Sequence, residues 1–116
     1  NFEGKKFLPI NKYKILGTTI NSILNNKISK CPNYVKIDVD GIEHLILSKA
    51  NNLLKNKELK SILIEINENY KRQLDTVLKI MKKNKFRLFR KEQSNSSNLP
   101  LKFKNTYNYI FIRNKN

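Results

Sequence analysis

The stretch YVKIDVDGIEHLIL, residues 34–47, places charged side chains at the end of an apolar strand that runs into a helix. Apolar and polar residues alternate at its start, which predicts a β-strand over residues 34–39. Lys36 and Asp38 share one face of that strand. An unpaired charge inside a buried strand costs several kcal/mol. We therefore expect this strand to end in an ion pair or in a functional site.

Helical and extended patterns alternate along the rest of the chain. Gly41 supplies a sharp turn after the first strand, and the apolar period of residues 42–56 predicts one helix. Its expected buried face is Ile42, Leu45, Ile46, Ala50, Leu53 and Leu54. The other expected elements are a short helix over 18–26 capped by Thr18 or Thr19, a strand over 61–66 covered on both faces, a helix from a cap at Asn67 or Asn69 to about Asn84, and strands over 86–91 and 107–113.

This order of elements predicts an α/β fold with a largely parallel sheet, in which the last strand takes an edge or antiparallel position. At 116 residues the chain is one domain or part of one. No apolar run approaches the roughly 20 residues of a membrane span, and the start lacks the apolar region of a signal peptide. We expect a cytoplasmic protein.

The net charge of +15 invites a nucleic-acid interpretation. Lys (20 residues), Asn (18) and Ile (14) are all abundant, however, which is typical of an AT-rich coding sequence. Arg, which contacts phosphate in a forked geometry, occurs only four times. We therefore predict no specific nucleic-acid partner.

One cysteine and one histidine exclude an internal disulfide and a zinc site built from these residue types, and we predict no metal. Cys31 is expected to be an unreactive thiol, because no neighbour along the chain lowers its pKa. His44 is expected to face solvent from the helix that follows Gly41.

Acidic residues cluster where two predicted strands end. Asp38 and Asp40 close the first, Glu43 lies in the first turn of the next helix, and Glu65 lies near the end of the second strand. Ligands of open α/β sheets bind beyond the carboxyl ends of the strands, so adjacent parallel strands would bring these acids to one crevice. The alternative is structural: Lys36 pairs with Asp38, and Glu65 caps a neighbouring helix.

The segments YVKIDVDGIEHLILSKANNLL (34–54) and LKSILIEIN (59–67) resemble the signature half of the FkbM-family methyltransferases. Seven positions carry the likeness: Lys36, Ile37, Asp38, Val39, Gly41, Glu43 and Glu65. ILGTTINSIL, residues 15–24, is similar to the segment that precedes this strand in the family. The chain departs from the pattern at Asp40, where Glu is usual, and at Asn21, where Asp is usual.

The resemblance implies an S-adenosylmethionine-dependent O-methyltransferase with a class I Rossmann-like fold and a final antiparallel strand. Asp38 would lie near the methyl-bearing end of the cofactor, as a cofactor-binding and catalytic residue, and Glu65 is the second catalytic candidate. Asp40, Glu43 and Lys36 would shape the site of the acceptor. That acceptor, a small molecule or glycan, would offer a hydroxyl of a sugar or natural product.

The Gly-rich loop and the acid that hold the cofactor in this family are expected upstream of residue 1. We therefore expect residues 1–116 to be a single partial domain, the C-terminal portion of the methyltransferase, which binds S-adenosylmethionine poorly by itself. Two alternatives remain: a non-catalytic basic α/β module that contacts RNA or an acidic partner, and an inactive methyltransferase remnant.

Overall fold

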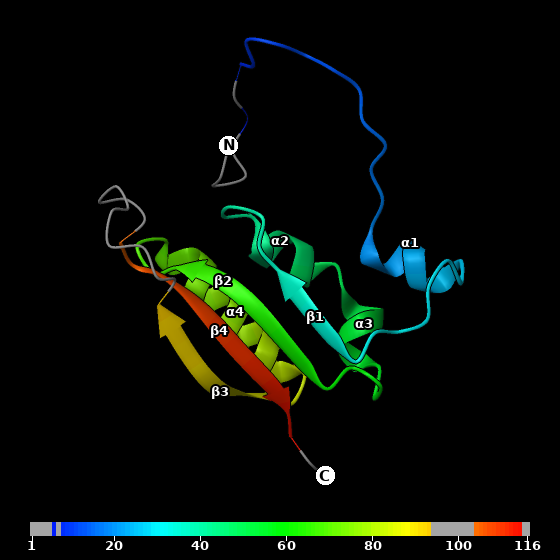
Figure 1. Cartoon of the computed structure of the whole chain (residues 1–116), viewed down its shortest axis with the longest axis vertical. Coiled ribbons are helices and arrows are strands. Elements are labelled where there is room, and N and C mark those ends of the chain that lie inside the picture. The colour runs from blue at the N-terminus through cyan, green and yellow to red at the C-terminus, as the bar shows by residue number, and fades with distance from the viewer. Residues whose placement is uncertain (1–5, 7, 94–103, 115–116) are drawn as a thin grey trace.

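The computed structural model describes residues 6, 8–93 and 104–114 as a four-stranded sheet packed against helices (Figure 1). The strands are β1 (Tyr34–Ile37), β2 (Ser61–Asn67), β3 (Phe86–Gln93) and β4 (Thr106–Arg113). Their order across the sheet is β1-β2-β4-β3. The described chain is therefore an open α/β sheet, as the alternation of patterns predicts.

Three strands point the same way and the last strand runs opposite to them. β1 and β2 are parallel, whereas β4 is antiparallel to its neighbours β2 and β3. The predicted antiparallel direction of the last strand is confirmed, but β4 lies inside the sheet and not at its edge. Its Tyr109 and Phe111 are buried with ring centroids 6.1 Å apart, and they lie opposite the buried Ile64 and Ile62 of β2.

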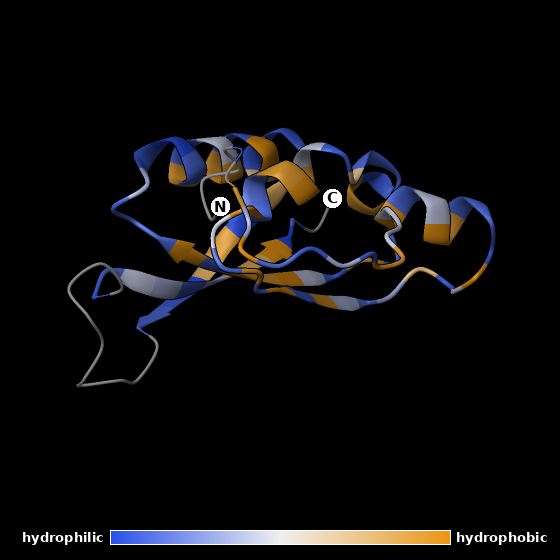
Figure 2. Cartoon of the chain, turned by 90° about the horizontal axis from the view of Figure 1, so that it is seen from above, coloured by the Kyte–Doolittle hydropathy of each residue, from blue (hydrophilic) through white to orange (hydrophobic). Residues whose placement is uncertain are grey.

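The helices lie on one side of the sheet, as Figure 2 shows. They are α1 (Ile20–Asn25), α2 (Glu43–Ser48), α3 (Asn51–Lys55) and α4 (Lys71–Lys83). On β2, Ile62, Ile64 and Ile66 are completely buried, and each stabilises the fold by about 1.5–3 kcal/mol. Leu63 and Glu65, on the other face of β2, are only half-buried. The prediction that this strand is covered on both faces is thus wrong for the described chain.

The single helix predicted over residues 42–56 is in fact two short helices. The Ser48 hydroxyl donates to the Leu45 carbonyl (2.7 Å), and the Ala50 N–H bonds to Leu47 O (3.1 Å). Such side-chain bonds to the backbone compete with continued helix. The prediction applies one helical period to both helices, and it places Leu45 in the core and leaves Leu47 out. In the structure Leu45 is 45% exposed and Leu47 is 0% exposed.

The helix ends follow the predictions in part. Thr19 caps α1 by accepting a hydrogen bond from the Ser22 N–H at 3.0 Å, which confirms one of the two predicted caps. The predicted asparagine cap of α4 is wrong, because Tyr70 holds the N-cap position and its side chain makes no capping hydrogen bond. Asn67 instead accepts from the Asn69 N–H at 3.0 Å. None of the described helices has the length and apolar character needed to cross a membrane.

Arg113, at the end of β4, ties the sheet to α3 and to the segment after it. Its Nε donates to Leu59 O (2.8 Å), and its Nη2 donates to Leu54 O (3.0 Å) and Asn56 O (2.7 Å). The guanidinium carbon lies 4.4 Å from the centre of the Phe86 ring. Burial lowers the pKa of this guanidinium. The bonds fix the end of the sheet opposite the acidic residues.

Candidate functional site

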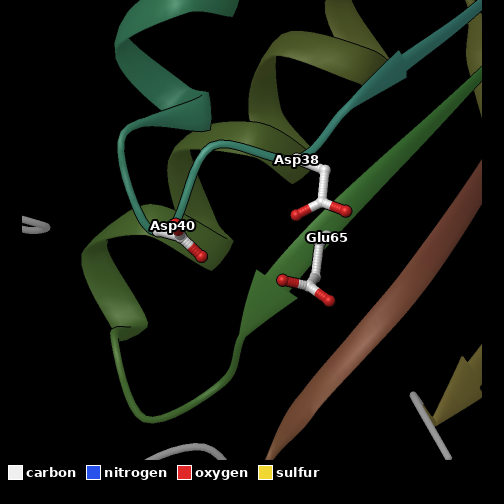
Figure 3. A group of neighbouring side chains, drawn as sticks. All are labelled: Asp38, Asp40 and Glu65. Atoms are coloured by element: carbon white, nitrogen blue, oxygen red, sulfur yellow. The ribbon is translucent and has the colours of Figure 1, made fainter.

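The register of β1 and β2 brings two acidic side chains together at the carboxyl ends of the strands. The last paired residues are Ile37 and Ile64, and both are buried in the core. Successive side chains of a strand point to opposite faces. Asp38 and Glu65, the next residues along, therefore point away from the core, and Figure 3 shows their carboxyl groups close together.

Asp40 joins this pair from the loop after β1. Its φ of 58° and the φ of 117° at Gly41 are left-handed values, which Asp tolerates and Gly adopts without steric cost. One carboxylate oxygen of each of Asp38, Asp40 and Glu65 lies within 4.8 Å of the others. The predicted convergence of Asp38 and Glu65 is therefore present in the structure, whereas their catalytic roles stay predictions.

This acidic cluster (Asp38, Asp40 and Glu65) does not by itself identify a metal site. Carboxylate oxygens are the ligands that Mg²⁺ and Ca²⁺ prefer. Exposed acids at such spacing are nonetheless common without a bound ion. The absence of a metal therefore stays a prediction.

Glu43 holds the loop that carries the cluster. It is only 1% exposed, and its Oε1 accepts the N–H groups of Val39 (3.0 Å) and Gly41 (3.1 Å). Its Oε2 accepts a short hydrogen bond from Nε2 of Gln73 on α4. The carboxylate thus has three protein donors, which gives it a structural task beside the acceptor-binding role predicted for it.

Lys36 pairs with Asp38, as the structural alternative predicts. Lys36 Nζ lies 2.9 Å from the Asp38 carboxylate. This hydrogen bond is the main reason that the pKa of Lys36 is raised. The Asp38 side chain keeps 34% of its surface exposed, so the premise that its charge is buried is wrong. The reason is the uncovered face of the sheet, where water solvates the carboxylate.

Each of two separate hollows is lined in part by members of the acidic cluster. The first, of about 310 Å³, is lined by Asp40 and Glu65 together with residues of α4 and the start of β4. The second, of about 840 Å³, is lined by Asp38 and by residues of α1, β1 and α2. Both volumes fall within the range of small-molecule sites. The cluster therefore lies between two hollows and does not line a single pocket.

Sequence reasoning assigns no role at the site to four polar residues of the first hollow, Asn67, Tyr70, Gln73 and Thr106. Gln73 and Thr106 are absent from every predicted site or cap. Both are buried, at 3% and 8% exposure. One signal for Gln73 is present in the sequence. It precedes Val77 by four residues, which places a polar side chain on the apolar face of α4. Thr106 precedes the predicted last strand by one residue, and nothing in its neighbours marks it.

The two other reactive side chains lie outside the cluster. Burial raises the pKa of the Cys31 thiol, which agrees with the unreactive thiol expected from the sequence. The prediction that His44 faces solvent is wrong in part, because the residue is half-buried. Its Nδ1 is buried without a hydrogen-bond partner in the described chain.

Comparison of the chain with models of known protein families identifies the family that carries this arrangement of acids. A model of the methyltransferase FkbM domain matches residues 9–88. The chain belongs to the FkbM methyltransferase family. The FkbM match includes the whole acidic cluster and Gln73, and it ends before β4. No curated protein and no solved structure matches the chain.

Proposed function

We propose that this FkbM domain serves an S-adenosylmethionine-dependent O-methyltransferase that acts on a hydroxyl of a sugar, glycan or natural product. Methyl transfer to a hydroxyl requires an oriented acceptor oxygen and a group that takes its proton. The acidic cluster offers both, because its carboxylates accept hydrogen bonds and protons. The single observation that carries the proposal is the convergence of Asp38, Asp40 and Glu65 within 4.8 Å at the carboxyl ends of two parallel strands.

The strand arrangement supports the Rossmann-like class I fold that we propose with this activity. β1 and β2 are parallel with acids at their carboxyl ends, and the final strand, β4, runs antiparallel between β2 and β3. Sites of open α/β sheets lie at that edge. The proposal assigns the described chain to the C-terminal portion of the methyltransferase domain, with the Gly-rich cofactor loop supplied from outside residues 1–116.

In the proposed reaction the acids divide the binding of the acceptor and the removal of its proton among them. Asp38 orients the acceptor hydroxyl, and Asp38 or Glu65 takes the proton that this hydroxyl releases. Asp40 lines the first hollow with Glu65, where it accepts hydrogen bonds from further acceptor groups. Lys36, paired with Asp38 at 2.9 Å, offsets part of the negative charge of the cluster and holds that carboxylate in place.

The residues of the second hollow fit S-adenosylmethionine at its charged end. The Asp38 carboxylate lines this hollow beside the apolar side chains of Ile20, Val35 and Ile46. A carboxylate suits the positive sulfonium, and apolar walls of this kind are usual in cofactor sites. Lys36, which pairs with Asp38, and Lys49 line the hollow as well, so the cofactor would have to share Asp38 with Lys36. When bound, S-adenosylmethionine supplies the methyl group.

The test is methyl transfer by the full-length enzyme with methyl-labelled S-adenosylmethionine and a panel of glycans and natural products. We expect Asp38→Asn or Glu65→Gln to lower kcat by about 100-fold or more, the usual share of a general base. Asp75→Asn, on an exposed position of α4, is the matched control. Wild-type rates in both cluster variants would refute the proposed roles.

A further inference from the structure

A third hollow, at the end of the sheet opposite the acidic cluster, is lined mainly by positively charged side chains. Its volume of about 480 Å³ falls within the range of small-molecule sites. The second hollow has two cationic residues among the eleven described residues that line it, and the first has none. Here the cationic residues are five of eight, and they define the basic hollow: Lys55, Lys57, Lys83, Lys85 and Arg113. The positive charge of the chain is therefore concentrated at this place.

No acidic side chain offsets the charge of the basic hollow. Neither Asp nor Glu is among the described residues that line it. Glu58 follows Lys57 in the chain, but its side chain is exposed and lies outside the lining. The ion pairs within the described part of the chain involve none of the five cationic residues. Positive groups gathered in a concave surface attract anions from solution.

Arg113 gives the basic hollow a charged group of fixed orientation. Three backbone carbonyls accept hydrogen bonds from its Nε and Nη2, and its Nη1 has no partner among the described residues. Burial lowers the pKa of this half-buried guanidinium, and no carboxylate of the described chain pairs with it. A desolvated charge without an opposite charge is stabilised when an anion binds beside it.

The structural alternative is that these lysines stabilise the ends of two helices. Positive side chains in the last turn of a helix interact favourably with the helix dipole, and the effect falls off beyond that turn. Lys55 and Lys83 lie in the last turns of α3 and α4. Lys57 and Lys85 each lie two residues beyond the end of these helices. The helix dipoles therefore account for only two of the four lysines.

We propose that the basic hollow is a binding site for a pyrophosphate group. Guanidinium and ammonium groups are the side chains that bind phosphate oxygens most strongly in proteins. A single phosphate group contacts only part of a hollow of this size, whereas two linked phosphate groups reach cationic residues on several sides of it. The end of β4 supplies Arg113, and the segments after α3 and α4 supply Lys57 and Lys85.

This site is distinct from the proposed site of methyl transfer. Thr106 lines the first hollow and Arg113 lines the basic hollow, at the two ends of β4. Seven residue steps of about 3.4 Å separate them, a distance of about 24 Å. One small acceptor therefore does not occupy both hollows, and the inference does not rest on the proposed function.

The experiment is a calorimetric titration of the full-length protein with inorganic pyrophosphate, in parallel with inorganic phosphate, at an ionic strength of about 0.15 M. Charges more than about 8 Å apart are largely screened under this condition, so the net charge of the chain contributes little. We expect pyrophosphate to bind at least about 10-fold more tightly than phosphate. The second phosphate group adds two or more ion pairs, each of which strengthens binding by up to about 5-fold.

Two double variants with equal net charge locate the site. Lys83→Gln with Lys85→Gln removes two charges from the basic hollow. Lys12→Gln with Lys71→Gln removes two charges from exposed positions that line none of the three hollows. We expect the first double variant to bind pyrophosphate about 5-fold or more weakly than wild type, and the second less than about 2-fold more weakly. All four side chains are exposed, so thermal unfolding should show both variants folded.

Two further titrations distinguish the source of the pyrophosphate group. One uses uridine diphosphate in solution, and the other uses phosphatidylcholine vesicles that carry geranylgeranyl diphosphate. Binding that the Lys83→Gln, Lys85→Gln variant weakens supports the site, and it assigns the ligand to soluble nucleotides or to lipids according to the titration in which it occurs. No binding of pyrophosphate at millimolar concentration overturns the site. Equal affinities for phosphate and pyrophosphate, or equal weakening in the two double variants, overturn it as well.

Discussion

Replacing Glu43 with alanine should unfold the loop that positions the acidic cluster. The substitution removes the acceptor of two backbone N–H groups, those of Val39 and Gly41, and of the Gln73 amide. Each buried donor left without a partner costs about 1–3 kcal/mol. The two backbone groups are only partly buried, so water recovers some of this cost. At the lower end for all three donors, we expect a loss of about 3 kcal/mol.

This loss is large enough to measure by thermal or urea unfolding. With an unfolding entropy of about 2.1 cal/mol/K per residue, 116 residues convert it to a fall in Tm of about 12 °C. Glu58→Ala, at an exposed glutamate, should change stability by about 0.5 kcal/mol or less. A loss below about 1 kcal/mol for Glu43→Ala, with the control unchanged, would refute the structural role of Glu43.

Three further predictions concern stability. Arg113→Lys loses the forked hydrogen bonds to three carbonyl groups, and it should lower the free energy of unfolding in urea by about 1–3 kcal/mol. Arg87→Lys, at an exposed position, is the control and should leave that free energy almost unchanged. Hydrogen bonds from Lys91 and then Tyr109 hold the pKa of Glu68 below its usual range. The stability that these bonds contribute is therefore present above the unfolded pKa of about 4.3, and it is lost as the pH falls through the lower folded pKa. Glu68→Gln should accordingly be less stable than wild type at neutral pH and equally stable in strong acid. A difference in stability that persists in strong acid would contradict this prediction. Gly41→Ala, at a φ of 117°, should lower the free energy of unfolding by about 1 kcal/mol or more. Gly17→Ala, where an added Cβ would meet open space, should leave it unchanged. Equal unfolding midpoints of the two variants would show that the turn at Gly41 does not require a glycine.

The sequence predicts the site better than it predicts the surroundings of the site. Two predicted neighbouring parallel strands, each with an acid at or near its carboxyl end, suffice to place Asp38 beside Glu65, because such ends meet at one edge of the sheet. The assumed burial of Asp38 fails because it depends on what covers the far face of the sheet. No local pattern carries that information.

Helix boundaries and polar contacts over long sequence distances are also beyond local patterns. The Ser48 hydroxyl at the end of α2 bonds to the Leu45 carbonyl. Such a bond is an alternative to the backbone bonds of a continued helix, and the sequence alone does not show which of the two forms. Glu43 is placed correctly at the start of a helix, but its bond to Gln73 joins residues 30 positions apart. Thr106 reaches the same hollow only through the pairing of β4 with β2.

Disulfide trapping tests most directly whether Asp38 and Glu65 are neighbours across β1 and β2. In a Cys31→Ser background, Asp38→Cys and Glu65→Cys would place two thiols on adjacent strands about 4.8 Å apart, within the range that a disulfide spans. Ile37→Cys with Glu65→Cys is the control, because Ile37 pairs with Ile64 and its side chain therefore lies on the face opposite to Glu65. We predict rapid intramolecular oxidation of the first pair, seen as the mass loss of one hydrogen per thiol, and slow oxidation of the control. If the first pair stays reduced, or oxidises no faster than the control, the two acids do not share a site.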